Sequence, residues 1–440
     1  MLKRKIVNDL LAWKNDPEKL CLMVNGARQV GKSTTIQEFC KEQYTHFIEM
    51  NFIENEEYMQ IFDGSLDKNT ILKQITLFFP EVELVSNETA IFLDEIQHCP
   101  RAITALKFLA KDERFDVITS GSLLGILYKS RTTKRKEHDI PSVPVGFVNH
   151  IEMHSLDFEE FLWANKIKPE TIDSIKEYYL EKKPVPPAMH SKLMELFREY
   201  IVVGGMPRVV QNFVINHNFG SVIKIQRDII NDYKKDITQY AEGNDKAKIR
   251  DCFLSIPNQL AKKYKKFQYS VVEKGEGARK YAGSIRWLVD AGIVARCDNL
   301  SIPELPLAGN VKEGEFKIYM RDTGLLVAML EDGSQKNIIN NDLKIYKGAI
   351  YENIIADIIT KSGKPLFYYA RDNKFEIDFI ERLSDIVVAI EVKSGDNTKS
   401  WSIKTIVGKY DVKKGIKFAT KNVCETDGIL TLPLYMAMFL

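Results

Sequence analysis

The segment 26–33 reads Gly26-Ala27-Arg28-Gln29-Val30-Gly31-Lys32-Ser33. It fits the pattern G-x-x-x-x-G-K-[ST], and it follows the apolar run 20–24 and opens a helical pattern. Glycines let such a loop wrap closely around phosphate oxygens, and the N-terminus of a helix favours negative charge. We therefore expect the phosphates of a nucleotide to bind here. The simpler alternative is an ordinary strand-to-helix turn that contains a lysine.

The side chains of this loop have separate expected roles. Lys32 has the length to reach the β and γ phosphates, and the hydroxyl of Ser33 can ligate Mg²⁺. ATP bound with Mg²⁺ is therefore the expected ligand. We expect it to contact the loop and the first helical turn, that is Gly26, Ala27, Arg28, Gln29, Val30, Gly31, Lys32, Ser33 and Thr34.

A second motif follows at 91–95, where a buried-strand pattern ends in two carboxylates, Asp94 and Glu95. We expect Asp94 to hold the Mg²⁺ ion and Glu95 to orient and deprotonate the attacking water, as hydrolysis of ATP requires. A solvated strand end is the alternative interpretation. The strand pattern at 115–119 is followed by Ser120 and Ser122, which are candidates for sensing the γ-phosphate at the sheet edge. Capping of a helix by either serine is an equally good explanation.

The pattern along the chain predicts three domains. Apolar runs at 20–24, 45–52, 90–94 and 115–119 alternate with helical patterns at 36–43 and 103–112, which is typical of an α/β fold with a wound parallel sheet. From Leu156 to about Leu260 the pattern is helical, and residues 267–320 mix extended runs with a helix near 278–289. We expect a polar connection over 321–345, and then a helix and strands. The expected domains are 1–165, 166–330 and 331–440.

Longer stretches resemble a known family over essentially the whole chain. They are GARQVGKST, LDEIQ, ITSGSLLG, PVGFVNHIEMHSLDFEEFLWA, YIVVGGMPRVV, IYMRDTGLL, GAIYENIIAD and LPLYMAMFL. The chain is similar to the AAA-type P-loop ATPases of bacteria and archaea that carry a C-terminal nuclease-like domain of unknown function. The resemblance implies an ATPase domain, a winged-helix region and a PD-(D/E)XK-like fold. Arg28, Arg101 and Arg114 are candidates for an arginine finger, and the sequence does not rank them.

Carboxylates in the C-terminal strands form a second candidate site. If 375–380 and 387–393 pair as an antiparallel hairpin with Asp378 opposite Glu391, the two carboxylates repel each other and favour a hard cation such as Mg²⁺. Lys393 lies on the same side and can support an attacking water. By the resemblance, Glu352 matches the helical glutamate of the PD-(D/E)XK pattern, and Asp378, Glu391 and Lys393 match its core. The alternatives are a surface salt-bridge ladder and an inactive relic that serves as an interaction fold.

Residues 246–300 resemble a winged helix with a local basic cluster. Its members are Lys262, Lys263, Lys265, Lys266, Arg279, Lys280 and Arg286. Such a cluster is suited to double-stranded DNA, although a solvated helix face and a protein-docking module are the competing interpretations.

Composition limits the class of protein. The 62 Lys and Arg residues nearly balance the 60 Asp and Glu residues, so no whole-chain field attracts nucleic acid or a membrane. No apolar run is long enough to span a membrane, and the scattered cysteines predict neither disulfides nor a zinc site. We therefore expect a cytoplasmic protein without a membrane partner. A homo-oligomer would be favoured if a neighbouring copy completed the ATP site.

These observations lead to one main hypothesis and two competitors. The main hypothesis is an ATP-hydrolysing protein that couples its nucleotide state to a DNA-binding, nuclease-like C-terminal region. The first competitor is a nucleotide-dependent switch whose inactive nuclease-like domain docks a protein partner. The second is a nucleotide-binding protein that scarcely turns over.

Overall fold

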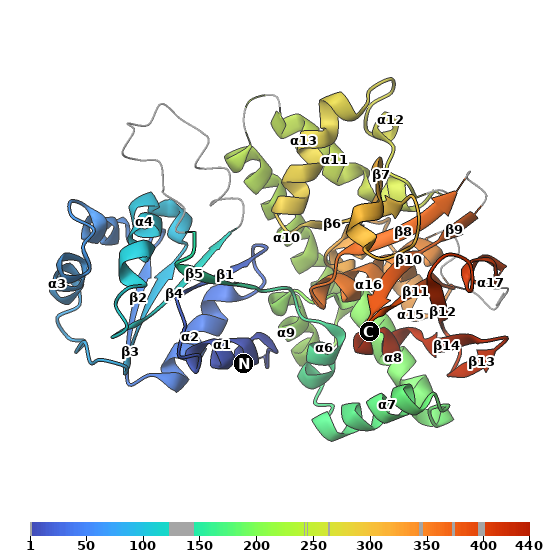
Figure 1. Cartoon of the computed structure of the whole chain (residues 1–440), viewed down its shortest axis with the longest axis horizontal. Helices are drawn as coiled ribbons and strands as arrows, with labels where there is room; N and C mark the ends of the chain where they lie inside the picture. Colours follow the sequence, from blue (N-terminus) through green and yellow to red (C-terminus); the bar gives the residue numbers. More distant parts are fainter. Residues whose placement is uncertain are drawn as a thin grey trace. The chain divides into compact units, whose positions relative to one another are not determined.

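The computed structural model describes residues 2–122, 145–241, 243, 245–262, 265–342, 346–371, 375–394 and 401–440, without the side chains of Ser122 and Tyr240. The chain forms two compact units. The first is Arg4–His154, and the second contains Ser155–Leu440 (Figure 1). The expected division into three domains remains a prediction.

The first unit is built on a parallel sheet with the strand order β2-β3-β4-β1-β5 in the described residues. This confirms the wound parallel sheet, and β1 to β4 lie where the apolar runs predict them. The sequence analysis missed β5, because its residues are only half-buried and polar ones interrupt its apolar pattern. The strands are β1 (Cys21–Gly26), β2 (His46–Asn51), β3 (Thr89–Asp94), β4 (Asp116–Ser122) and β5 (Val148–Glu152).

Helices cover both faces of this sheet. Successive strand residues point to opposite faces, so Leu22 and Val24 pack with α1 and α2, while Met23 packs with α3 and α4. The resulting three layers place the carboxyl ends of β3, β4 and β1 side by side at one edge. The helical elements are α1 (Ile6–Lys14), α2 (Lys32–Gln43), η1 (Glu56–Phe62), α3 (Lys68–Phe78), η2 (Ile96–His98) and α4 (Pro100–Leu109).

The second unit begins with the helices that the sequence predicts between Leu156 and Leu260. Their apolar faces pack together, and proline opens several of them at the first turn, where its missing N–H costs nothing. They are α6 (Phe158–Ala164), α7 (Pro169–Glu181), α8 (Pro187–Val203), α9 (Pro207–Asn216), α10 (Phe219–Tyr240) and α11 (Asp245–Leu260). They are followed by α12 (Tyr269–Val272) and α13 (Ala278–Asp290).

The prediction of a polar connection over 321–345 is wrong for most of this segment. It contains α14 (Thr323–Ala328) and α15 (Ser334–Ile339), while residues 343–345 lie outside the described part. Asp322 caps α14, because its carboxylate accepts a hydrogen bond from the Leu325 N–H at 3.0 Å. The apolar residues that follow are buried, so tertiary packing outweighs the polar composition of the segment.

Two mixed sheets complete the second unit, with the orders β7-β6-β8-β9 and β10-β11-β12-β14-β13. In the first sheet β6 pairs with β8, so one sheet joins strands from both sides of the expected boundary at 330. Its strands are β6 (Val294–Leu300), β7 (Val311–Met320), β8 (Leu366–Arg371) and β9 (Phe375–Ile377). The others are β10 (Phe379–Leu383), β11 (Ile386–Val392), β12 (Val412–Ala419), β13 (Cys424–Thr426) and β14 (Ile429–Pro433). The remaining helical elements are η4 (Leu307–Asn310), α16 (Lys347–Lys361), α17 (Trp401–Ile406) and η5 (Leu434–Phe439).

The predicted hairpin near the C-terminus is present. β10 and β11 pair antiparallel with Phe379 opposite Ile390, which is the register that places Asp378 beside Glu391. The strand β11 is buried on both faces, however, and Glu391 itself is only 5% exposed. The Glu391 carboxylate therefore lies in the interior, which disfavours the alternative of a surface salt-bridge ladder.

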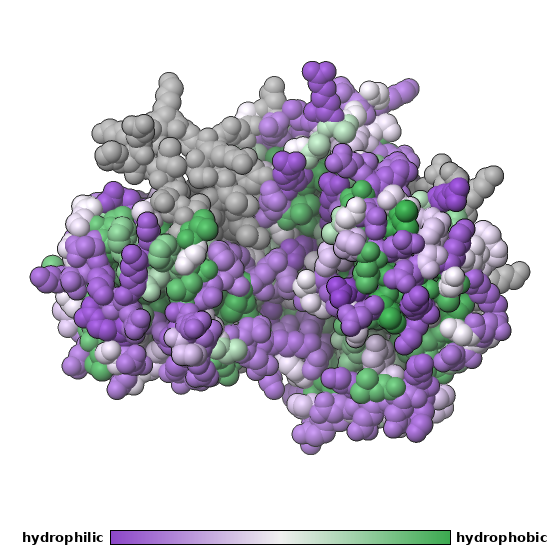
Figure 2. All heavy atoms as spheres, in the orientation of Figure 1, coloured by the Kyte–Doolittle hydropathy of each residue, from purple (hydrophilic) through white to green (hydrophobic). Residues whose placement is uncertain are grey.

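Hydrophilic side chains cover most of the face seen in Figure 2, with smaller apolar areas between them. Among the described helices, none combines the length and the apolar character that a membrane crossing needs.

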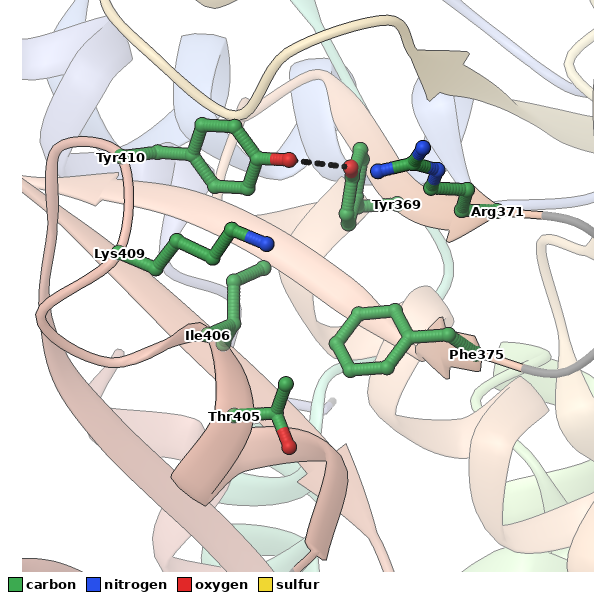
Figure 3. A pocket seen from close by; sticks show the side chains of 7 residues that line it. All are labelled: Tyr369, Arg371, Phe375, Thr405, Ile406, Lys409 and Tyr410. Atoms are coloured by element: carbon green, nitrogen blue, oxygen red, sulfur yellow. Dashed lines mark hydrogen bonds between the residues drawn. The ribbon is translucent and has the colours of Figure 1, made fainter.

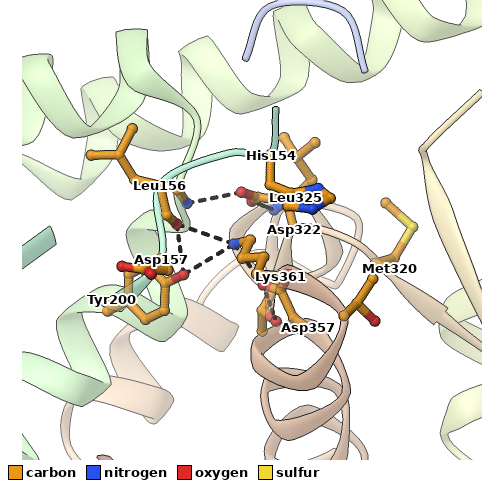
Figure 4. A network of polar contacts seen from close by, with 12 residues as sticks. His154, Leu156, Asp157, Tyr200, Met320, Asp322, Leu325, Asp357 and Lys361 are labelled. Atoms are coloured by element: carbon orange, nitrogen blue, oxygen red, sulfur yellow. Dashed lines mark hydrogen bonds and ion pairs between the residues drawn. The ribbon is translucent and has the colours of Figure 1, made fainter. Parts of the chain in front are cut away.

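The first residues of the second unit are held by a buried polar network (Figure 4). The main-chain oxygen of Leu156 accepts hydrogen bonds from the Tyr200 hydroxyl at 2.8 Å and from the Lys361 ammonium at 3.1 Å. Its N–H donates to the carbonyl of Gly205 at 2.7 Å, and the Gly205 N–H donates to Asp322 at 2.8 Å. This network fixes the path of the chain where the second unit starts.

Substitution of Gly205 tests this packing. A Cβ atom at Gly205 would lie 2.0 Å from the Leu156 carbonyl oxygen, and neither main chain can move without breaking the network. We expect Gly205→Ala to lower the free energy of unfolding of the second unit by about 2–3 kcal/mol, measured by denaturant unfolding. Gly283→Ala is the control, because its Cβ meets nothing within 4 Å and a helical alanine is neutral or stabilising. Equal stability of the two variants would contradict the role of the network.

Candidate functional site

The phosphate-binding loop joins β1 to α2, and its shape depends on two glycines. A Cβ atom at Gly26 would lie 2.2 Å from the main-chain oxygen of Met153, so only glycine fits there. Gly31 precedes α2 in the left-handed region with φ 94°, which favours glycine. Gln29 also has a positive φ of 64°. Together these turns bring the start of α2 close to the end of β1, as a phosphate cradle requires.

Lys32 lies at the first turn of α2 with its side chain buried. Its ammonium donates hydrogen bonds to the carbonyl oxygens of Gly26 at 3.1 Å and Ala27 at 2.9 Å. Burial lowers the pKa of Lys32 to about 8, although the nearby charges of Glu95 and Asp94 act in the opposite direction. Burial thus disfavours the charged form of the Lys32 ammonium, and the negative phosphates of a bound nucleotide would stabilise it.

Asp94 is almost fully buried at the end of β3 and accepts three hydrogen bonds. The donors are the Ser33 hydroxyl at 2.9 Å, the Asn51 amide at 3.0 Å and the Ser120 hydroxyl. Burial raises the pKa of Asp94, and the hydrogen bonds from the two serines partly oppose this. The sequence analysis missed Asn51, whose only signal was its position at the end of a strand.

Ser33 and Asp94 offer the oxygen ligands that Mg²⁺ prefers, a hydroxyl and a carboxylate, on adjacent elements. The donor set therefore fits this ion. The Ser120 hydroxyl donates its hydrogen bond to Asp94, so in this arrangement Ser120 positions the Asp94 carboxylate. Ser122 ends β4, but its side chain lies outside the described residues. The γ-phosphate sensor thus remains a prediction.

Glu95 directly follows β3 in the left-handed region, with φ 54° and ψ 42°. This conformation is uncommon for a residue with a side chain, and it turns the carboxylate away from the direction that a continued strand would give it. The amide of the buried Gln97 donates a hydrogen bond to the Glu95 carboxylate. The carboxylate is thereby held next to the pair formed by Ser33 and Asp94.

A buried arginine near the N-terminus supports the loop, and the sequence analysis missed it. The guanidinium of Arg4 donates to the main-chain oxygen of Val30 at 2.9 Å and to that of His154 at 2.6 Å. It thereby ties the loop to the chain that leaves β5. No local motif marks this residue, because its partners lie 26 and 150 positions away.

The arginine-finger candidates have different surroundings. Arg101 donates to the main-chain oxygen of Phe62 at 2.6 Å, and Arg114 forms a two-pronged pair with Asp112 at 2.8 and 2.6 Å. Both side chains therefore support local structure in the first unit. Arg28 lies within the phosphate-binding loop.

In the second unit, three carboxylates meet between the sheets and α16. One oxygen from each of Glu352, Glu376 and Asp378 lies within 4.8 Å of the others, a spacing that suits a metal ion. The structure thus brings together two of the expected residues, Glu352 and Asp378. It adds Glu376, to which the sequence analysis gave no metal role.

Two lysines are part of this acidic cluster, and the sequence analysis did not foresee them there. The ammonium of Lys317, which is 0% exposed, lies 3.0 Å from Glu352 and 2.5 Å from Glu376. Lys265 forms an ion pair with the other oxygen of Glu352, and the Tyr319 hydroxyl also donates to Glu352. Two positive charges therefore already lie among the three carboxylates.

The pKa values in the cluster follow from burial and these charges. Burial would raise the pKa of Glu352, but Lys265 and Lys317 outweigh it and lower the value to about 2. Burial, together with the charge of Glu352, raises the pKa of Asp378 to about 7. Glu352 is thus fixed in its charged form, while Asp378 is easily protonated. Protonation of Asp378 reduces the net negative charge of the cluster further.

The other two expected catalytic residues lie apart from these three carboxylates. Glu391 forms an ion pair with Lys393 through Oε1, and its Oε2 is buried without a hydrogen-bond partner in the described residues. Asp378 accepts a hydrogen bond from the Val392 N–H at 2.7 Å. The predicted register holds, but it does not bring Glu391 into the acidic cluster.

The basic cluster of residues 246–300 is largely paired within the protein. Lys265 binds Glu352, Lys266 lies 3.2 Å from Glu315, and Lys280 lies 2.9 Å from both Glu273 and Glu276. Lys262 bonds to Gln268, and Lys263 lies outside the described residues. Arg279 and Arg286 are exposed on α13. The winged helix and its contact with duplex DNA remain predictions.

Three segments of the chain match known protein families. Residues 18–162 match the AAA domain, which includes every strand of the first sheet. Residues 194–336 match a domain of unknown function (DUF8612), and residues 347–435 match another (DUF4143). No curated protein matches the sequence.

Several solved structures are similar to this chain, all at low identity. The Walker-type ATPase of Pyrococcus abyssi is 13% identical, with 75% of this chain and 96% of that chain covered and a TM-score of 0.45. The RuvB Holliday junction branch migration motor of Thermotoga maritima is 13% identical, with 67% and 90% covered and a TM-score of 0.30. A signal transduction ATPase of Pyrococcus horikoshii with a tetratricopeptide repeat sensor is 13% identical, with 83% and 46% covered and a TM-score of 0.25.

The sheet order, the phosphate-binding loop and the family match define the class of the first unit. It is a P-loop ATPase domain of the AAA kind. This part of the family resemblance is confirmed. The nuclease-like character of the C-terminal part remains a prediction.

Arg4 provides a test of how the loop is held. Arg4→Ala removes two hydrogen bonds from a charged donor, so the loop should lose its ordered shape and the affinity for ATP should fall about tenfold or more. Isothermal titration calorimetry with ATP and Mg²⁺ measures this directly. Lys19→Ala is the control, because its ammonium binds the main-chain oxygen of Lys14 and the Asp116 carboxylate and does not touch the loop. Unchanged affinity in a folded Arg4→Ala protein would contradict the supporting role.

Proposed function

We propose that the protein binds ATP with Mg²⁺ and hydrolyses it at the carboxyl edge of the first sheet. The observation that carries this proposal is the 2.9 Å hydrogen bond between the Ser33 hydroxyl and the buried Asp94 carboxylate, beside the phosphate-binding loop. These two side chains would hold the Mg²⁺ ion. When bound, the ion neutralises phosphate charge as the terminal phosphate leaves.

The remaining steps belong to Lys32 and Glu95. Lys32 would bind the β and γ phosphates. Their negative charge would stabilise the protonated form of the ammonium, which burial disfavours. Glu95 would orient the attacking water and accept its proton, since its carboxylate is held by Gln97 next to Asp94. Both roles use positions that the backbone of the loop and the end of β3 fix in advance.

Two substitutions separate binding from hydrolysis. Glu95→Gln keeps the shape of the site but cannot accept a proton, so we expect ATP to bind normally and turnover to fall about 100-fold or more. Lys32→Ala should lose nucleotide binding itself. Phosphate release and calorimetry measure the two properties, and Glu81→Gln, an exposed carboxylate of the same unit, is the control. Wild-type turnover in Glu95→Gln would contradict hydrolysis at this site.

For the second unit, we propose the switch rather than the nuclease: nucleotide state controls a domain that docks a protein partner and does not cleave nucleic acid. The supporting observation is the position of Lys317, whose ammonium bridges Glu352 and Glu376. A divalent cation would have to displace this lysine or share the cluster with it, and like charges at that distance repel strongly. We therefore interpret the cluster as an ion-pair network of the fold.

Replacement of Lys317 tests this proposal. Lys317→Met leaves the buried Glu352 and the partly exposed Glu376 with one cation fewer, which should destabilise the second unit by about 3–5 kcal/mol. Mg²⁺ or Mn²⁺ should then restore part of the loss, seen as slower hydrogen exchange in α16, whereas the same cations should leave α16 of the wild type unchanged. Lys336→Met, an exposed lysine of α15, is the control. Mg²⁺-dependent strand breakage by the wild type that disappears in Glu391→Ala would establish the nuclease instead.

A further inference from the structure

The pocket between β8, β9 and α17 has polar groups that bond mainly within the fold (Figure 3). Its volume is about 260 Å³. The hydroxyls of Tyr369 and Tyr410 lie 3.1 Å apart, and Thr405 donates to the main-chain oxygen of Trp401 at 2.7 Å. Arg371 also has a partner in the fold. The pocket therefore offers few groups to a polar ligand.

Gln97 in the first unit is different, because one half of its side-chain amide has no partner. The residue lies in η2, shortly after β3, and is 1% exposed. Its Nε2 donates to the Glu95 carboxylate, while its Oε1 is buried without a hydrogen-bond partner among the described residues. A buried carbonyl without a partner is costly, so another interaction must stabilise this orientation of the amide.

The charge of Glu95 explains the orientation. An ionised carboxylate only accepts hydrogen bonds, whereas a side-chain amide donates through its nitrogen and accepts through its oxygen. If the amide of Gln97 were turned by 180°, its carbonyl oxygen would face the carboxylate, and the two acceptors would repel each other. The observed hydrogen bond therefore depends on the donor of Gln97 and the charge of Glu95 together.

The main chain brings these two side chains together. Glu95 lies in the left-handed region, and η2 follows at once. The turn is closed by a hydrogen bond from the His98 N–H to the main-chain oxygen of Glu95 at 3.0 Å. Ile96 is 0% exposed and belongs to the core of the first unit. Gln97 thus has a fixed position from which it holds Glu95.

A base that removes a proton from water must lie within hydrogen-bond reach of that water, and a small displacement slows the reaction strongly. Glu95 is only partly buried, so burial alone does not fix its side chain. The nearby ammonium of Lys32 would also attract a carboxylate that is not held. The hydrogen bond from Gln97 opposes both displacements.

We propose that Gln97 is a positioning residue for ATP hydrolysis. Its amide holds the Glu95 carboxylate where the attacking water binds, so turnover depends on this donor while binding of the nucleotide does not. This inference rests on the proposed hydrolysis at the carboxyl edge of the first sheet and adds the residue that keeps the base in place.

Gln97→Leu tests the inference in the full-length protein, because leucine has a similar volume but donates no hydrogen bond. We expect kcat to fall about tenfold or more, while KM and the calorimetric affinity for ATP with Mg²⁺ stay within about twofold of the wild type. Gln97→Glu replaces the donor by an acceptor and should lower kcat at least as far. Gln74→Leu is the matched control and should keep the wild-type kcat, since Gln74 of α3 also has a buried Oε1 without a partner among the described residues.

A second comparison shows whether Gln97 acts through Glu95. In Glu95→Ala no carboxylate remains to be positioned, so the addition of Gln97→Leu should change the residual turnover by less than about twofold. A further tenfold loss in the double variant would overturn the inference. Gln97→Met, which is unbranched and also lacks the donor, gives the same comparison if the leucine variant does not fold.

The wild type separates this inference from the proposed function. Absence of ATP turnover in the wild type would remove the proposed function and the role of Gln97 with it. An active wild type whose kcat is unchanged in Gln97→Leu would overturn the role of Gln97 alone.

Discussion

The nucleotide site depends on main-chain packing between the end of β1 and the chain that leaves β5. Gly26 lies so close to the oxygen of Met153 that no side chain fits between them, and the Met153 N–H donates to the Asn25 oxygen at 2.7 Å. Arg4 extends this contact to the loop itself by binding the oxygens of Val30 and His154. Because Met153 and Arg4 hold the loop in place, its amides could face the phosphates of a nucleotide without a large loss of conformational entropy on binding.

Two buried lysines of this chain show how similar residues acquire different functions. In the part of the chain that the structure describes, the direct partners of Lys32 are carbonyl oxygens, and burial lowers its pKa, so an incoming anion would stabilise it. Burial would lower the pKa of Lys317 as well, but Glu352 and Glu376 outweigh it and raise the value well above normal. Lys317 is therefore satisfied within the fold. We therefore expect the first lysine to bind a ligand and the second to stay within the ion-pair network of the fold.

The sequence was informative wherever the decisive contacts are local. The loop residues, Asp94 and Glu95 follow from one motif and one strand end, and the register of β10 with β11 follows from the alternation within a short hairpin. The strand β5 was missed because polar residues interrupt its apolar pattern, and the helix α14 was missed because its burial depends on neighbours that are remote in sequence. The same holds for Lys317, which is 35 residues from Glu352 and 59 from Glu376, so no spacing rule could pair them.

The charges of the acidic cluster are balanced within the second unit. In the acidic cluster, Lys265 and Lys317 neutralise the carboxylates inside the core, where unpaired charge would be costly. The distribution of charge in the second unit therefore supports the proposal that the acidic cluster is an ion-pair network of the fold.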